Sequence, residues 1–127
     1  MKNFVLYLSL FALLAGCGEK IPTTFRAVGL HENQSYKIEV KIGRLDTAPA
    51  IAVFLNDEQA LYVERPMSSR SDPNCKYKSG YIWTCRFADT YKGMKLVVVE
   101  ESHAVPFALF YDVYLDGQLV QRVTGTL

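Results

Sequence analysis

The sequence predicts an all-β protein: a single antiparallel β-sandwich of about eight strands, with a small β-barrel as the alternative. Three observations lead to this prediction. Apolar and polar residues alternate in several segments, which is the period of a half-buried strand. Short turn-forming sequences separate these segments, and among them Asp116-Gly117 is a strong hairpin signal. No segment shows a convincing helical pattern.

The expected strands follow one another along most of the chain. The clearest is 35–43, in which apolar residues alternate with lysine and glutamate. The runs 50–55 and 59–65 flank the turn-forming residues Asn56-Asp57-Glu58, which indicates a hairpin. The complete set of expected strands is 24–30, 35–43, 50–55, 59–65, 81–87, 94–101, 107–115 and 118–124.

The start of the chain, MKNFVLYLSLFALLAGC, has the features of a secretory signal. Lys2 supplies a positive charge, and an apolar run from Phe4 to Ala15 follows, interrupted only by Ser9. The run is shorter than the roughly 20 residues that a membrane-spanning helix needs. The sequence therefore predicts export.

Leu14-Ala15-Gly16-Cys17 resembles the lipobox of bacterial lipoproteins. In that family the cysteine is acylated and becomes the first mature residue. The resemblance implies a signal peptide at 1–16, a lipidated Cys17 with a short tether at 17–23, and a domain at 24–127. Gly18 rather than Asp follows the cysteine, which in this family favours the outer membrane, and we expect a periplasm-facing domain.

Acylation of Cys17 leaves Cys75 and Cys85 as a pair in an oxidising compartment, so we expect a disulfide between them. Closing a loop of about eleven residues contributes roughly 2–3 kcal/mol in the chain-entropy description. A metal site is not predicted for this pair.

The expected mature chain has no net charge and only a short tether. Lys2 is one of 14 basic residues, and without it the basic side chains equal the 13 acidic ones. A neutral chain offers no electrostatic reason to bind nucleic acid. The tether GEKIPT reaches about 20 Å when extended. The domain is therefore expected to work close to the bilayer.

The residues predict a protein without enzymatic activity, metal or cofactor. No nucleophile elbow or phosphate-binding glycine loop is present. The two histidines, His31 and His103, are far apart in sequence. Glu100, Glu101 and His103 are expected to alternate in direction along a strand, which makes a poor metal site.

The segment RPMSSRSDPNCKYK, residues 65–78, is the longest without a strand pattern and is rich in basic residues. Because loops on rigid scaffolds often carry binding residues, we expect this loop to bind an acidic envelope-protein partner. The alternative is a solvated connection whose cysteine serves stability alone. The candidate partner-binding residues are Arg70, Lys76, Tyr77, Lys78 and Ser79.

Trp83 is expected to share a face with Cys85 and to pack in the core beside the disulfide. A tryptophan that stacks on a ligand is the alternative.

Two stretches resemble other families. YIWTCRF followed by MKLVVVEES is similar to the core of C2 domains, which implies a ligand- or ion-binding module with calcium near Asp46 and Glu101. Ser79-Gly80-Tyr81-Ile82-Trp83 resembles the Ser-Gly-x-x-Tyr loop of membrane-bound c-type lysozyme inhibitors, with Trp in place of Tyr. Tyr91-Lys92-Gly93 is similar to a second element of that family, and the resemblance implies that Ser79 enters the lysozyme cleft.

The short tether and the sandwich together are similar to lipoproteins that brace envelope machines, such as the outer-membrane lipoprotein of type VI secretion. We therefore expect an outer-membrane lipoprotein that binds or assembles with another envelope protein. A periplasmic lysozyme inhibitor and a C2-like module are the alternatives.

Overall fold

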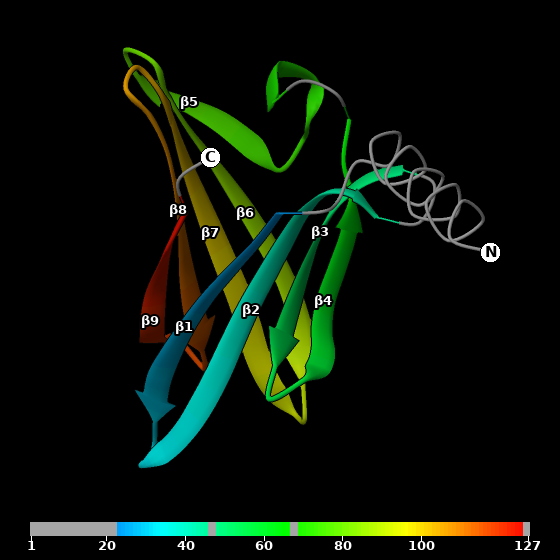
Figure 1. Ribbon diagram of the computed structural model, residues 1–127, viewed down its shortest axis with the longest axis vertical. Helices are drawn as coiled ribbons and strands as arrows, with labels where there is room; N and C mark the ends of the chain where they lie inside the picture. Colours follow the sequence, from blue (N-terminus) through cyan, green and yellow to red (C-terminus); the bar gives the residue numbers. More distant parts are fainter. Residues whose placement is uncertain (1–22, 46–47, 67–68, 126–127) are drawn as a thin grey trace, which may run out of the picture.

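The computed structural model describes residues 23–45, 48–66 and 69–125. Within these ranges nine strands form two antiparallel sheets, and each sheet is an up-and-down meander (Figure 1). The four-stranded sheet contains β1 (Thr23–His31), β2 (Gln34–Leu45), β3 (Ala48–Leu55) and β4 (Glu58–Glu64). The five-stranded sheet contains β5 (Cys75–Ser79), β6 (Ile82–Tyr91), β7 (Met94–Ala104), β8 (Phe107–Leu115) and β9 (Gln118–Gly125). A 3₁₀ turn, η1 (Ser69–Ser71), precedes β5.

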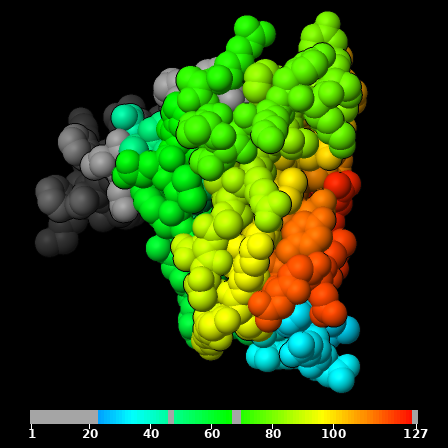
Figure 2. Space-filling model, turned by 180° about the vertical axis from the view of Figure 1, so that it is seen from behind, coloured from blue at the N-terminus to red at the C-terminus, as the bar shows by residue number. Residues whose placement is uncertain are grey.

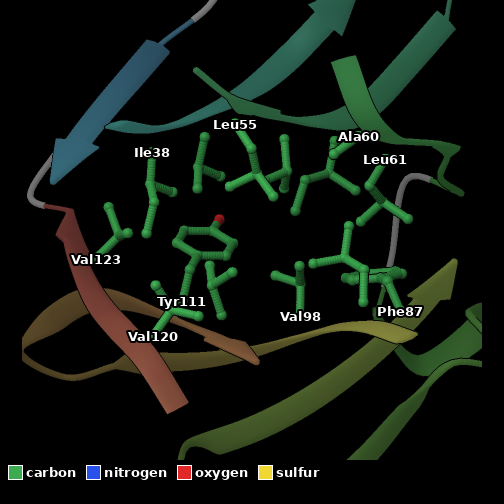
Figure 3. Close-up of a cluster of buried hydrophobic side chains, with 14 of the residues drawn as sticks. Ile38, Leu55, Ala60, Leu61, Phe87, Val98, Tyr111, Val120 and Val123 are labelled. Atoms are coloured by element: carbon green, nitrogen blue, oxygen red, sulfur yellow. The ribbon is translucent and has the colours of Figure 1, made fainter. Parts of the chain in front are cut away.

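The predicted β-sandwich is confirmed, and its core lies between the two sheets. In most strands alternate residues point inward, as in Ile38 and Val40 of β2 and Val98 of β7, which are fully buried. Figure 3 shows side chains from both sheets meeting in this layer. Hydrogen bonding between the described strands leaves two separate sheets and does not close them into a barrel.

Four two-residue hairpin turns lie at one end of the molecule, which we call the turn end. Both central residues of each turn have positive φ, as the type I′ turn requires, and this turn matches the twist of paired strands. The hairpin predicted at Asp116-Gly117 is among them. The four turns are Glu32-Asn33, Asn56-Asp57, Lys92-Gly93 and Asp116-Gly117.

The opposite end, which we call the tether end, is where β1 begins. Thr23 pairs there with Ile42 of β2. The connections β2–β3, β4–β5, β5–β6 and β7–β8 are made at the same end. Figure 1 shows the tips of β5–β6 and β7–β8 at the top, above the upper ends of β1 to β4.

The edges formed by β1 and β9 approach each other closely. A Cβ placed on Gly29 of β1 would lie 2.6 Å from the backbone oxygen of Val120 and 2.8 Å from the Cβ of Gln121. Glycine therefore permits this approach of backbone to backbone.

The strand β5 is a correction to the sequence prediction, which had no strand between the expected strands 59–65 and 81–87. All residues from Lys76 to Ser79 are exposed, so the strand has no alternation of apolar residues. It pairs with β6 from Cys75↔Cys85 onward. Tyr81, expected at the start of a strand, lies in the turn between β5 and β6.

Candidate binding surface at the tether end

The predicted disulfide is present and joins directly opposite residues of β5 and β6. Cys75 and Cys85 are register partners, with their Cα atoms 4.0 Å apart. Cys85 belongs to the buried core, and Cys75 packs against that core. The bond therefore attaches an otherwise exposed edge strand to the interior of the sandwich.

Arg65, the residue after β4, forms an ion pair that links the two sheets. Its Nη1 donates to Oε2 of Glu100 at 2.8 Å, and its Nη2 donates to Oε1 at 3.0 Å. Its Nε lies 3.5 Å from Oδ2 of Asp72. Burial by itself would lower the pKa of the Arg65 guanidinium, but the hydrogen bonds and charge of Glu100 raise the pKa above its ordinary value.

The same guanidinium lies against the disulfide. Arg65 Nη2 is 3.3 Å from Sγ of Cys85 and 3.7 Å from Sγ of Cys75. Asp72 also accepts a hydrogen bond from the backbone N–H of Asn74 at 2.9 Å. Arg65 is therefore part of an internal network, although the sequence counted it among the basic residues of a surface loop.

The candidate residues Lys76, Tyr77, Lys78 and Ser79 come together on β5, and all four are exposed. Lys78 Nζ lies 3.3 Å from Oε2 of Glu101. Arg70 is exposed on η1, the turn next to β5. In the described part of the chain β5 is an edge strand whose only strand partner is β6.

Trp83 lies at the margin of the core, which corrects the prediction that it packs deeply beside the disulfide. The side chain is half-buried and meets the exposed Tyr77 edge-to-face, with ring centroids 5.8 Å apart. Trp83 points to the same face of the sheet as Cys85, but it lies two residues nearer the tether end. It is opposite Ser102 of β7, which in turn pairs with Leu109 of β8.

A cleft of about 390 Å³ opens between the two sheets at the tether end. Its walls include Ile42 and Pro49 from the four-stranded sheet and Leu109 from β8. Arg65, Glu100 and Tyr111 supply polar groups to the same cleft.

The Tyr111 hydroxyl is buried and has no hydrogen-bond partner among the described residues. Figure 3 shows it pointing from the five-stranded sheet toward the four-stranded sheet. Burial, followed by the negative charge of Glu100 and a side-chain interaction with its carboxylate, raises the pKa of the Tyr111 phenol above its usual range. This carboxylate binds Arg65 through both of its oxygens and does not meet hydrogen-bond geometry with the Tyr111 hydroxyl.

The tips of the β5–β6 and β7–β8 hairpins lie side by side. The backbone N–H of Ala104 donates to the carbonyl oxygen of Tyr81 at 3.1 Å. Tyr81, Val105 and Phe107 are 69%, 72% and 50% exposed. Figure 2, seen from behind, shows the light-green β5–β6 tip projecting at the top, with the cyan β1–β2 turn at the bottom.

The calcium prediction gains no support from the residues that can be located. No group of three or more His, Cys, Asp or Glu residues is placed to hold a metal within the described ranges. Glu101 instead accepts from His103 Nε2 at 2.7 Å and pairs with Lys78. Asp46 lies outside the described residues, as does Cys17.

The two elements that resemble those of lysozyme inhibitors lie at opposite ends of the molecule. Ser79-Gly80 is at the tip of the β5–β6 hairpin, and Lys92-Gly93 forms the β6–β7 turn at the turn end. The strand β6 between them has 10 residues, a length of about 33 Å. The two elements therefore cannot enter one cleft together.

Comparison with known proteins identifies no relative: no family, curated protein or solved structure matches the chain. Among residues 23–45, 48–66 and 69–125, no helix is long and apolar enough to cross a membrane.

Proposed function

We propose that the chain is a lipid-anchored, non-enzymatic envelope protein that binds a protein partner through β5. The observation that carries the proposal is the exposed edge strand held to the core by Cys75–Cys85. Loops and edges positioned by a rigid scaffold are common places for binding residues. Fixing such a segment before binding reduces the entropy lost when a complex forms.

The side chains of β5 favour an acidic partner with an apolar contact. Lys76 and Lys78 present positive charge, and Tyr77 is 59% exposed. Tyrosine is enriched in protein interfaces because it combines a large apolar ring with a hydroxyl. Lysine on an edge strand also discourages indiscriminate strand pairing, so a partner with complementary carboxylates has the advantage.

The free edge of β5 suits β-strand addition, in which an extended partner segment continues the sheet. The ladder between β5 and β6 occupies one side of β5 and leaves the other side without a strand in the described part of the chain. The backbone N–H of Cys75 already donates to the carbonyl oxygen of Asp72 at 3.1 Å. The proposed partner contact therefore combines backbone hydrogen bonds along 76–79 with the basic and aromatic side chains.

The anchor in this proposal is an acylated Cys17 in the outer membrane, and the domain faces the periplasm. Several acyl chains on one cysteine give stable attachment, because each buried methylene contributes about 0.8 kcal/mol. The partner is accordingly an envelope protein that reaches the same membrane surface, as in an assembly such as a secretion system.

A site-specific crosslinking experiment tests the partner contact in cells. A photoreactive amino acid is placed at Tyr77 in the full-length chain, with Leu119 at the turn end as the matched position, since its side chain is 52% exposed. We expect one protein adduct at position 77 and none at 119. The charge reversal Lys76→Glu, which leaves the Lys78–Glu101 ion pair in place, should weaken the adduct and leave the melting temperature unchanged.

A control variant tests the anchor separately from the partner contact. Cys17→Ala should remove the lipid and release the chain from the membrane, which mass spectrometry and membrane fractionation detect. Equal adducts at 77 and 119, or no adduct at either, would show that β5 is not the binding surface.

A second candidate function, inhibition of a lysozyme-type enzyme, is favoured by one observation. Ser79-Gly80 lies at the exposed tip of a protruding hairpin, where it can reach a concave site. A muramidase assay with the full-length protein tests it: inhibition that Ser79→Trp removes would support this function. Unchanged enzyme activity would exclude it.

A further inference from the structure

We infer that the tips of the β5–β6 and β7–β8 hairpins insert into the interfacial layer of the lipid bilayer that holds the chain. The inference rests on the lipid anchor proposed above. It adds a second, non-covalent membrane contact that sets the orientation of the domain.

Several exposed large apolar side chains lie at these two tips, namely Tyr81, Val105 and Phe107. Of the other four on the described surface, Tyr77 belongs to the proposed partner contact, and Val28, Leu30 and Leu119 lie toward the turn end. The hydrogen bond between Ala104 and Tyr81 keeps the two tips adjacent. They therefore offer one apolar surface and not scattered single residues.

The composition of this surface fits a bilayer interface. Aromatic rings with a polar group are enriched at the level of lipid headgroups, and Tyr81 provides one of them. Val105 and Phe107 supply purely apolar groups at the neighbouring tip.

The direction of the chain places these tips near the anchor. β1 begins at Thr23 at the tether end, the end from which both tips project (Figure 1). Thr23 lies six positions after Cys17 in the sequence, which limits their distance to about 20 Å. An acylated Cys17 thus holds the tether end, and not the turn end, against the membrane.

A fluorescence experiment measures which end meets lipid. Trp83 is the only tryptophan, so Trp83→Phe gives a background without indole. Tyr81→Trp then reports the tip and Leu30→Trp reports the turn end, and the two native side chains are 69% and 66% exposed. Each full-length variant is purified from membranes, its acylation state is determined by mass spectrometry, and it is reconstituted into phosphatidylethanolamine–phosphatidylglycerol vesicles, with and without brominated acyl chains.

We expect brominated lipid to reduce the emission of the indole introduced by Tyr81→Trp about twofold and to leave that of Leu30→Trp nearly unchanged, because bromine quenches only indoles at membrane depth. Circular dichroism of each variant verifies that the β-sandwich is retained. Replacing Val105 and Phe107 by serine in the Tyr81→Trp variant should reduce the quenching.

The alternative outcomes are distinct. Absence of quenching at the tip, with acylation of Cys17 confirmed by mass spectrometry, overturns the inference and leaves the anchor standing. Equal quenching at both ends also overturns it, because the domain then has no fixed orientation. Quenching at the tip without acylation of Cys17 supports the inference and overturns the anchor.

Discussion

Arg65 and Glu100 form a two-point ion pair across the sandwich, with N–O distances of 2.8 Å and 3.0 Å. Both side chains are largely removed from solvent. A pair of this kind is costly to break on one side, because the remaining partner is left as a buried, uncompensated charge. The pair therefore holds the segment after β4 against β7, next to the Cys75–Cys85 disulfide.

Replacing Arg65 alone should be strongly destabilising. We expect Arg65→Met to lower the free energy of unfolding by about 3–5 kcal/mol, measured by urea unfolding followed through Trp83 fluorescence. The exposed pair Arg122–Asp112 is the control, since Arg122→Met should cost about 0.5 kcal/mol.

The loss should be largely reversed only when the buried carboxylates are neutralised as well. Arg65→Met/Glu100→Leu leaves Asp72 without its cation, so we expect full recovery only with Asp72→Asn in addition. Equal stability of Arg65→Met and the wild type would mean that the ion pair carries no net stabilisation.

Removing the Tyr111 hydroxyl should not lower the stability of the fold. Because this buried group has no hydrogen-bond partner among the described residues, we expect Tyr111→Phe to leave stability unchanged or to raise it by up to about 1 kcal/mol. In Tyr36 the hydroxyl donates to Gln34 Oε1 at 3.2 Å, and Tyr36→Phe should cost about 0.5–1 kcal/mol. A larger loss for Tyr111→Phe in thermal unfolding would reveal a bound water or ligand in the cleft.

The disulfide should stabilise β5 more than the rest of its sheet. We expect Cys75→Ala/Cys85→Ala to lower the free energy of unfolding by about 3 kcal/mol, the loop-closure value for this spacing. Hydrogen exchange should accelerate in Lys76–Ser79, while the amides of β9 at the other edge keep their relative protection. Uniform acceleration along both edges would contradict this account.

A side chain at Gly29 should destabilise the fold, because β1 and β9 approach each other closely there. Gly29→Ala would push a methyl group into the backbone of Val120, and we expect a loss of about 1–3 kcal/mol in urea unfolding. Val28→Ala, at an exposed neighbouring position, should change stability by less than about 0.5 kcal/mol. Equal effects of the two changes would show that the two edges move apart easily.

Stability should fall in acid partly through Glu101. The hydrogen bond from His103 lowers the pKa of Glu101, burial opposes this shift, and Lys78 lowers the pKa further. A carboxyl group with a lower pKa in the folded state stabilises the fold above its unfolded-state pKa of about 4.5, and this contribution disappears as pH falls through the folded-state pKa.

Glu101→Gln should therefore make the melting temperature less dependent on pH below about 4.5. Thermal unfolding between pH 7 and pH 2 measures the difference. Identical curves for the variant and the wild type would assign the acid sensitivity to other carboxylates.

Local sequence patterns determined most of this fold. Alternation in 35–43 predicted β2, and the positive-φ pairs Asn56-Asp57 and Asp116-Gly117 formed the turns that their residue types favour. The pairing of Cys75 with Cys85 also followed from the sequence, once the resemblance to lipoproteins accounted for the third cysteine. These features depend on residues that are adjacent in the sequence or on the number of cysteines, so the sequence alone is enough to predict them.

Only the tertiary structure decided the features that make up the candidate surface. β5 buries almost no side chain, so it carries no alternation, and it exists because a neighbouring strand and a disulfide hold it. Arg65 turns inward because Glu100, 35 residues later, faces it from the other sheet. Trp83 sits at the core margin because the sheets diverge at the tether end. The alternation of apolar and polar residues predicts which side of a strand is buried. Which residues bury that side is decided by how one sheet packs on the other.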